Sequence, residues 1–235
     1  MDEAQLVKRS WAVRNRIYSS GGELMLTVPI SRVGSRETTT INSAKISSDS
    51  DWVRKHVASI KHSYQSAPFV NDFLAIFEPI INAEISNLGN LNIGIISAFC
   101  NALGIDTRLD KTSNMATPKS SKEAWLIDIC LEKRAGLYLS SLGSSSYLEV
   151  EKERGKYVSD KFLASDISLK YQNYGHPDYV QMNNKTRFVP YMSIVDLVVN
   201  LGWAASKDLI LSGIKEPLSP QDVRKGTLGK TDKSS

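Results

Sequence analysis

The sequence predicts an α/β protein with a mixed, partly parallel sheet flanked by helices and with a three-helix segment in the middle. Helical patterns alternate with short apolar strands after Leu103 and Ala135, which is typical of crossovers between parallel strands. Between residues 49 and 104, apolar residues recur with helical spacing over three successive stretches. A chain of 235 residues can bury one sizeable core. We therefore expect a single domain over residues 1–215.

Strand and loop are expected from the N-terminus to residue 46. Residues 24–30 have strand composition, follow the turn signal Gly21-Gly22, and include a proline near their end. Residues 41–46 are a weaker candidate strand. The three helices follow, over residues 50–64, 70–87 and 92–104. The polar face of the first helix includes His56 and His62, and we expect both imidazoles to be solvated because their spacing does not suit a metal site.

Helix and strand alternate through the second half of the chain. The predicted elements are a strand at 105–109, a helix from Ser120, a strand at 137–139, a charged helix at 149–162, a strand at 167–171 and a helix at 194–201. The strand at 137–139 opens into a loop of small residues, which is where open α/β sheets bind ligands. Few apolar residues occur from 216 to 235, so we expect a disordered tail there.

Composition and missing motifs exclude several classes of function. The net charge of only +4 argues against a protein that binds DNA through a basic surface. No apolar stretch reaches the roughly 18 residues that cross a bilayer, and the N-terminus is acidic and polar. We therefore expect a cytoplasmic protein without a membrane span, in which Cys100 and Cys130 are buried thiols. Nucleotide-binding, serine-hydrolase and zinc motifs are all missing from the sequence, so we expect no cofactor and no metal.

A basic cluster near the N-terminus is the first candidate binding site. Within nine residues it combines Trp11 with several polar side chains, namely Lys8, Arg14, Asn15 and Arg16. Guanidinium groups suit phosphate or carboxylate, and a tryptophan ring can stack on a sugar or base. The alternative is a solvated basic turn in which Trp11 is an anchor in the core.

A polar, aromatic loop after the strand at 167–171 is the second candidate. Residues 171–181 contain three tyrosines, His176, two amides besides that of Gln181, and a carboxylate. Such a loop offers donors and acceptors to a polyhydroxylated ligand, and His176 could act as a general base near neutral pH. The alternative is a proline-containing loop whose aromatic side chains pack locally.

Short motifs in a fixed order connect these clusters with a known family. They are R-N-R-I at 14–17, L-T-V-P-I at 26–30, A-P-F at 67–69, L-I-D-I-C at 126–130, Y-L-S at 138–140, Y-L at 147–148, H-P-x-Y-x-Q at 176–181 and S-I-V-D-L at 193–197. Together they resemble the WbqC-like proteins of bacterial surface-polysaccharide gene clusters. The resemblance extends over about residues 2–203.

The resemblance implies a transferase in surface-polysaccharide or related amino-sugar biosynthesis, which moves an acyl or aminoacyl group onto an amino sugar. The expected partners are a sugar or nucleotide-sugar substrate and an activated donor. The alternative is a non-catalytic sugar- or nucleotide-binding accessory protein of the same pathway. Family members usually begin with Q-P-x-x-x-P-W-x-G-Y-F and an apolar strand. Both are missing from this sequence, so we expect a chain that is truncated relative to its family, with residues 1–10 poorly anchored.

On this interpretation, His176 is the catalytic base that takes a proton from the attacking amine. The remaining site residues are expected to bind substrate: Lys8, Arg14 and Arg16 through phosphate or carboxylate, Asn15, Tyr179 and Gln181 through hydroxyl groups, and Ser140 and Tyr147 in the same pocket.

Overall fold

The computed structural model describes residues 1–7, 9–31, 39–48, 51–116, 120, 122–182 and 187–231. The chain divides into two compact units. Unit 1 comprises Met1–Ser113 and His176–Ser212, and unit 2 comprises Asn114–Gly175 and Gly213–Ser235. The assignment of residues 1–215 to a single domain stays a prediction.

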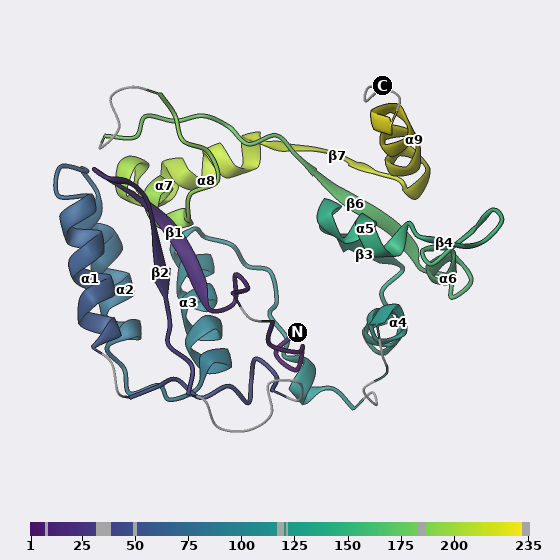
Figure 1. Cartoon of the computed structure of the whole chain (residues 1–235), viewed down its shortest axis with the longest axis horizontal. Helices are drawn as coiled ribbons and strands as arrows, with labels where there is room; N and C mark the ends of the chain where they lie inside the picture. The colour runs from purple at the N-terminus through teal and green to yellow at the C-terminus, as the bar shows by residue number, and fades with distance from the viewer. Residues whose placement is uncertain are drawn as a thin grey trace. The chain divides into compact units, whose positions relative to one another are not determined.

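Unit 1 combines a β-hairpin with helices (Figure 1). Its elements are β1 (Arg14–Ser19), β2 (Gly22–Thr27), α1 (Trp52–Ser63), α2 (Val70–Ile81), α3 (Leu88–Ala102), the 3-10 helix η1 (Thr112–Asn114), α7 (Ile194–Leu201) and α8 (Trp203–Ser212). The two strands pair antiparallel, with Ile17 opposite Leu24. The chain turns between them at Gly22, whose φ of 101° is a conformation that glycine adopts without steric strain.

The core of unit 1 lies between the hairpin and helices α1, α2, α3 and α7. Ile17 from β1, Ile60 from α1 and Val198 from α7 are almost completely buried. The Phe73 ring of α2 lies with its centroid 5.3 Å from that of Phe77 and 5.6 Å from that of Phe99. These inward positions follow the 3.6-residue periodicity from which the three central helices are predicted. The expected three-helix segment is therefore present.

The N-terminal residues are anchored, contrary to the expectation for residues 1–10. The buried carboxylate of Asp2 accepts hydrogen bonds from the Thr112 hydroxyl at 2.8 Å, the Ser113 backbone N–H at 3.1 Å and the Ser113 hydroxyl at 2.5 Å. Burial acts to raise the pKa of Asp2, but these hydrogen bonds outweigh it and hold the pKa well below its ordinary value. The Leu6 N–H also donates to the Thr39 carbonyl at 2.9 Å.

Unit 2 contains a three-stranded sheet with helices packed on it. Its elements are α4 (Lys122–Glu132), β3 (Leu137–Ser140), the 3-10 helix η2 (Leu142–Ser144), α5 (Ser145–Leu148), β4 (Glu151–Glu153), β5 (Lys156–Tyr157), α6 (Asp160–Leu163), β6 (Ser168–Tyr174), β7 (Ile214–Leu218) and α9 (Pro220–Thr231). The strand order is β3-β6-β7, in which β3 runs parallel and β7 antiparallel to β6. This arrangement confirms the mixed, partly parallel sheet.

Three predicted elements of regular structure are wrong. The charged segment at 149–162 is not one helix but the hairpin of β4 and β5 followed by the single-turn α6. Gly155, with a φ of 75°, lies at the turn between the two strands, where the left-handed region favours glycine. Residues 105–109 form no strand, and residues 41–46 contribute only isolated bridges, such as Ile30 with Ile46.

The disordered tail expected over residues 216–235 stays a prediction, although much of this segment forms regular structure. Residues 216–218 end β7, α9 covers Pro220–Thr231, and residues 232–235 lie outside the described residues. Val223 of α9 is buried in the core of unit 2. The Arg224 Nε donates to Glu149 Oε2 at 2.6 Å, and its Nη2 donates to the Ser159 hydroxyl at 2.7 Å. A segment poor in apolar residues is thus anchored through the buried Val223 and through two ion pairs of Arg224, with Glu149 and with Asp160.

Candidate functional site

A cavity of about 400 Å³ lies within unit 1. This volume is in the range of small-molecule binding sites, about 300–1,000 Å³. Residues of β1, β2, α1, α2 and α3 and the first residues of α7 line it. Most lining side chains are apolar, and the polar and amphipathic ones are Trp11, Arg14, Asn15, Trp52, His56, Asn92, Cys100 and Ser193.

Two arginines of β1, Arg14 and Arg16, have different surroundings. Arg14 lines the cavity, and its buried Nε has no hydrogen-bond partner in the part of the chain that the structure describes. In contrast, the Arg16 Nε donates to the Tyr191 carbonyl at 2.8 Å, and its Nη1 forms an ion pair with Glu23 at 3.1 Å. The Arg16 guanidinium also lies 5.6 Å from the ring centroid of Trp11. Among the described residues, the Arg14 Nε–H therefore lacks an acceptor, whereas the Arg16 guanidinium is engaged within the protein.

His56 is a further polar group in the cavity wall, and the expectation that its imidazole is solvated is wrong. The side chain is only 9% exposed, and its ring packs edge-on against Trp52 at a centroid distance of 5.1 Å. Burial lowers the pKa of His56, although a hydrogen bond with the backbone of Thr27 acts in the opposite direction. The imidazole is consequently neutral at pH 7. His62 is exposed, as expected.

Tyr191 connects the basic segment with the loop that contains His176. Its carbonyl accepts from Arg16, and its N–H donates to His176 Nε2 at 3.4 Å. The His176 Nδ1 lies 3.0 Å from the Pro177 carbonyl, and the imidazole packs edge-on against the Tyr191 ring at 5.1 Å. A hydrogen on Nδ1 satisfies both contacts. The structure thus brings these two sequence-predicted clusters together within unit 1, and both nitrogens of His176 contact backbone groups.

Asp196 of α7 accepts hydrogen bonds from three side chains. The sequence does not single it out as a site residue. Its fully buried carboxylate accepts from the Tyr64 hydroxyl at 2.7 Å, the Tyr179 hydroxyl at 2.6 Å and Gln181 Nε2 at 2.7 Å. Gln181 also pairs through both amide atoms with the backbone of Val189. The polar atoms of Tyr179 and Gln181 therefore fix the loop to α7.

Burial, together with the charge of Asp196, raises the pKa of both Tyr64 and Tyr179 above the ordinary range. Both hydroxyls consequently stay protonated and donate to the carboxylate. No cation lies within ion-pair distance of Asp196 among the described residues, so neutral donors satisfy this charge.

The remaining predicted site residues are Asn15, Ser140, Tyr147 and Lys8. Asn15 lines the cavity and is exposed, and its Oδ1 accepts from the Arg16 N–H at 2.9 Å. Ser140 and Tyr147 belong to unit 2, where the buried Ser140 hydroxyl lies 2.7 Å from that of Ser144. Their place in one pocket with the residues of unit 1 stays a prediction. Lys8 lies outside the described residues.

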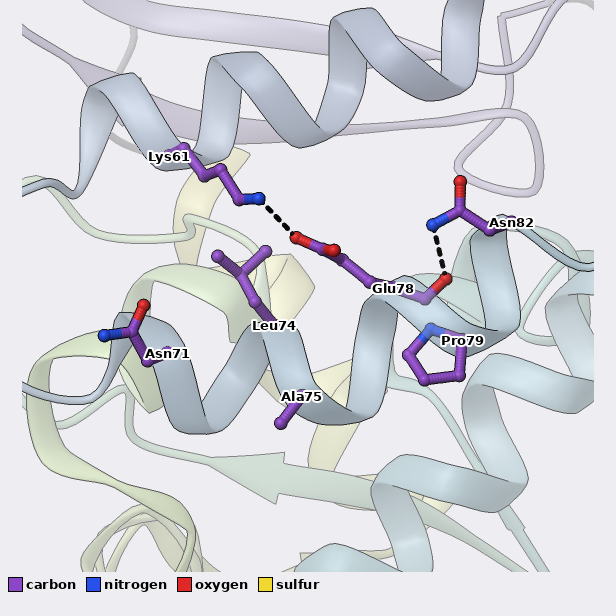
Figure 2. Close-up of a pocket in the computed structure, with 7 residues that line it drawn as sticks. All are labelled: Lys61, Asn71, Leu74, Ala75, Glu78, Pro79 and Asn82. Carbon is purple, nitrogen blue, oxygen red and sulfur yellow. Dashed lines mark hydrogen bonds and ion pairs between the residues drawn. The ribbon is translucent and has the colours of Figure 1, made fainter.

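A second hollow, of about 350 Å³, lies over α2 and the end of α1. Figure 2 shows that Lys61 and Glu78 point toward one another across it, with Nζ and Oε1 2.7 Å apart. The Asn82 side chain donates to the Glu78 carbonyl at 2.9 Å. Because these polar groups already pair with one another, this hollow is a weaker candidate than the cavity that Arg14 lines.

No three His, Cys, Asp or Glu side chains gather as a metal site within the described ranges. The same part of the chain contains no helix with the length and apolar character needed to cross a bilayer.

Together these features define a mixed α/β protein with a ligand-sized, largely apolar cavity, lined by an arginine whose buried Nε has no hydrogen-bond partner in the described part of the chain. The chain belongs to the WbqC-like protein family, whose model matches residues 1–208. It is similar to the uncharacterized protein Rv1507c of Mycobacterium tuberculosis (strain ATCC 25618 / H37Rv), with 31% identity over 202 residues, 86% of this chain and 82% of that protein. No solved structure matches the chain. The family associates this protein with surface-polysaccharide gene clusters.

Sequence reasoning missed two residues of this region for different reasons. His56 lies between Trp52 and Ile60 at intervals of four residues, so helical periodicity could have assigned it to their buried face. The spacing of Ser193 and Asp196 suits a capping pair at the start of α7. In the structure Ser193 does cap α7 by accepting from the Val195 N–H at 3.1 Å, but the Asp196 carboxylate binds side chains distant in sequence. No local signal indicates those partners.

Proposed function

We propose that this protein transfers an acyl group from an anionic activated donor to the amino group of an amino sugar, in surface-polysaccharide or related metabolism. The family association supports the pathway. The observation that carries the reaction class is Arg14, a cation in the wall of a ligand-sized cavity, whose buried Nε has no hydrogen-bond partner among the described residues. A buried N–H donor without a partner is costly, and a bound phosphate or carboxylate oxygen would offset that cost.

The reaction requires one nucleophile and one proton acceptor. The amine nitrogen attacks the acyl carbonyl carbon, a C–N bond forms, and the bond to the leaving group breaks. The leaving group departs with the electron pair as an anion, which Arg14 can stabilise. A base must take one proton from the attacking nitrogen.

We assign the proton acceptor to His56 rather than to His176. His56 lines the cavity and its lowered pKa keeps the imidazole neutral, so that it can accept a proton at pH 7. The sequence-based candidate, His176, remains the alternative. Its Nε2 keeps a lone pair that meets the Tyr191 N–H only at 3.4 Å.

Trp11 is the proposed contact for the acceptor sugar. It lines the cavity while 62% of its surface is exposed, so part of the ring is open to a ligand. Aromatic faces with a polar edge suit amphipathic rings such as sugars. Asn15, exposed beside it in the cavity wall, would hydrogen-bond a sugar hydroxyl.

We place this activity in the cytoplasm. Both cysteines of the chain, Cys100 and Cys130, are free thiols, which is typical of a reducing compartment.

A non-catalytic sugar- or nucleotide-binding role is the second candidate, and a specific observation favours it. Tyr179 and Gln181, expected to contact substrate, direct their polar atoms at Asp196 and Val189. Both nitrogens of His176 contact backbone groups. Polar atoms that are already hydrogen-bonded within the protein are more consistent with a loop that forms part of a binding site than with one that supplies catalytic groups.

The test is a transfer assay with mass-spectrometric detection of the acylated sugar. Purified protein would be incubated with nucleotide-linked amino sugars and with acyl thioesters, acyl phosphates and aminoacyl esters. We expect Arg14→Gln to lower kcat/KM about 10- to 100-fold, the effect of one charge-assisted hydrogen bond. Arg16→Gln, with its guanidinium engaged elsewhere, is the matched control and should change kcat/KM much less. Absence of product with every donor, together with measurable sugar binding, would favour the accessory role.

His56→Asn and His176→Asn then distinguish the two bases. Loss of a general base costs about 10²- to 10⁴-fold in kcat. We expect that loss in His56→Asn, together with loss of the acidic limb of the pH–rate profile. The same changes in His176→Asn alone would return the role to His176.

A further inference from the structure

The wall of the unit 1 cavity is apolar over most of its area. Side chains from the hairpin, from α1 and α2 and from α3 contribute to it, together with Ile194 and Val195 at the start of α7. The apolar set from the helices α1 to α3 comprises Ile60, Phe77, Ile81, Leu91, Ile95, Ile96, Phe99 and Leu103. Such a surface gains free energy by contact with another apolar surface, in proportion to the area removed from water.

Two of the polar groups in this wall already have partners. The Asn92 side chain donates to the Ala12 carbonyl at 2.9 Å, and the Ser193 hydroxyl accepts from the Val195 N–H at 3.1 Å. A sugar inside the cavity would therefore lose its hydrogen bonds with water. The lining side chains would offer its hydroxyl groups few new hydrogen-bond partners. Each unmet hydroxyl would cost about 1–3 kcal/mol by the general rule for buried polar groups.

Arg14 provides a contrasting element. Within a wall that is otherwise apolar or neutral, its guanidinium is the single cation among the lining residues, and its Nε is buried without a partner in the described structure. A ligand that complements both features has an apolar chain and an anionic group at one end.

We infer that the cavity binds the hydrocarbon chain of a medium-length acyl donor, with a carboxylate or phosphate oxygen of the donor against Arg14. This inference rests on the proposed function in one respect, namely that the bound molecule is the donor of the transferred acyl group. It narrows the class of donor substrates. The transferred group is then an aliphatic acyl chain, and small polar groups such as acetyl or glycyl do not fill the site. The sugar stays outside this chain-binding space, at the exposed ring of Trp11.

Direct binding of simple carboxylates tests the inference without any transfer reaction. Acetate, hexanoate, octanoate and decanoate would be titrated by calorimetry, with decyltrimethylammonium as the cationic counterpart of decanoate. We expect affinity to rise about threefold to fourfold per methylene, the increment for a buried CH₂. Decanoate should bind with a negative heat-capacity change, as burial of apolar surface requires, and the cationic amphiphile should bind more weakly.

Substitutions locate the binding. Arg14→Gln should weaken decanoate about tenfold or more, whereas Arg16→Gln, two residues away in the same strand, should leave it unchanged. Ile95→Trp would fill the cavity from α3 and should abolish binding of decanoate. Ile96→Trp, at a half-exposed lining position, is the second filling variant in case the first does not fold, and circular dichroism checks each variant.

These experiments distinguish a failure of the chain-binding site from a failure of the proposed acyl transfer. Equal affinity for acetate and decanoate, or decanoate binding that neither Arg14→Gln nor a folded filling variant reduces, would overturn the chain-binding site. Transfer of acetyl or glycyl groups without decanoate binding would overturn it too and leave the proposed function standing. Decanoate binding that responds to both substitutions, with no transfer to any amino sugar, would support the site while the proposed function failed.

Discussion

The hydroxyl of Tyr64 donates a hydrogen bond of 2.7 Å to the buried carboxylate of Asp196, across 132 positions of sequence. Tyr64 follows α1 directly, and Asp196 lies in the first turn of α7. The Tyr64 oxygen also accepts from the Tyr18 N–H of β1 at 3.0 Å. This pair therefore joins three elements that surround the cavity.

We expect Asp196→Asn to lower the free energy of unfolding by about 2–4 kcal/mol, because an amide would place donors against the donors of Tyr64, Tyr179 and Gln181. Tyr64→Phe should cost about 1.5–3 kcal/mol, the range for a hydrogen bond to a charged group. Urea denaturation measures both values. Asp208→Asn, at an exposed aspartate of α8, is the control and should change stability by less than about 0.5 kcal/mol. Equal effects of Asp196→Asn and Asp208→Asn would show that the buried carboxylate does not stabilise the fold.

The second prediction concerns acid stability and His56. Because its pKa in the folded protein is lowered from the ordinary 6.5, the folded state binds this proton less readily than the unfolded chain. The protein therefore keeps the full contribution of His56 to its stability above pH 6.5, where His56 is neutral in both states. It loses stability as the pH falls below the pKa of His56 in the unfolded chain toward the lower pKa of His56 in the folded protein. His56→Gln should remove that acid-side loss, measured as the change in urea midpoint between pH 7.5 and pH 5. His62→Gln, at an exposed position in the same helix, should not alter it. An unchanged pH slope in His56→Gln would contradict the burial of a neutral imidazole.

The third prediction concerns the attachment of α9. Glu149, whose side chain is 7% exposed, accepts from both Arg224 and the Tyr171 hydroxyl. Arg224→Ala removes the cation and should destabilise unit 2 by about 2–3 kcal/mol, somewhat less than for a fully buried ion pair. Hydrogen exchange in residues 220–226 should then accelerate, and proteases should cut there first. Lys225→Ala, at the neighbouring exposed residue, controls for loss of a positive charge in α9. If α9 stays equally protected in both variants, the ion pair does not anchor it.

The fourth prediction concerns the N-terminal anchor. Asp2→Asn should cost about 1–2 kcal/mol, because the amide accepts through one oxygen only, where the carboxylate accepts three hydrogen bonds from Thr112 and Ser113. The folded pKa of Asp2 lies below its ordinary 3.8. Its stabilising contribution is therefore present above pH 3.8 and is lost as the pH falls through the folded pKa. Unfolding at pH 2 to 6 should show a weaker acid dependence in Asp2→Asn than in Asp178→Asn, an exposed control. Identical pH dependence in the two variants would rule out this anchor.

Local patterns in the sequence were sufficient to predict those helices and strands whose formation depends on their own residues. The helix predicted at 194–201 matches α7 in both bounds, because Ser193 caps it and its apolar residues repeat with helical spacing. The strand predicted at 137–139 lies within β3. The family also followed from short motifs whose order is a property of the sequence alone. In contrast, the charged segment at 149–162 has no apolar periodicity strong enough to distinguish a hairpin from a helix.

Tertiary structure decided the attachments and the cavity. The attachment of β7 and of the start of α9 depends on the edge of β6 and on Glu149, which no local composition reveals. Likewise, the sequence identifies Arg14 and Arg16 as equivalent cations two positions apart. Only the fold pairs Arg16 with Glu23 and Tyr191 and leaves the Arg14 Nε in the cavity wall without a hydrogen-bond partner among the residues that the structure describes. The physical reason is that periodicity and capping act over a few residues, whereas the pairing of a charge depends on which distant groups the packed chain brings within about 3 Å of it.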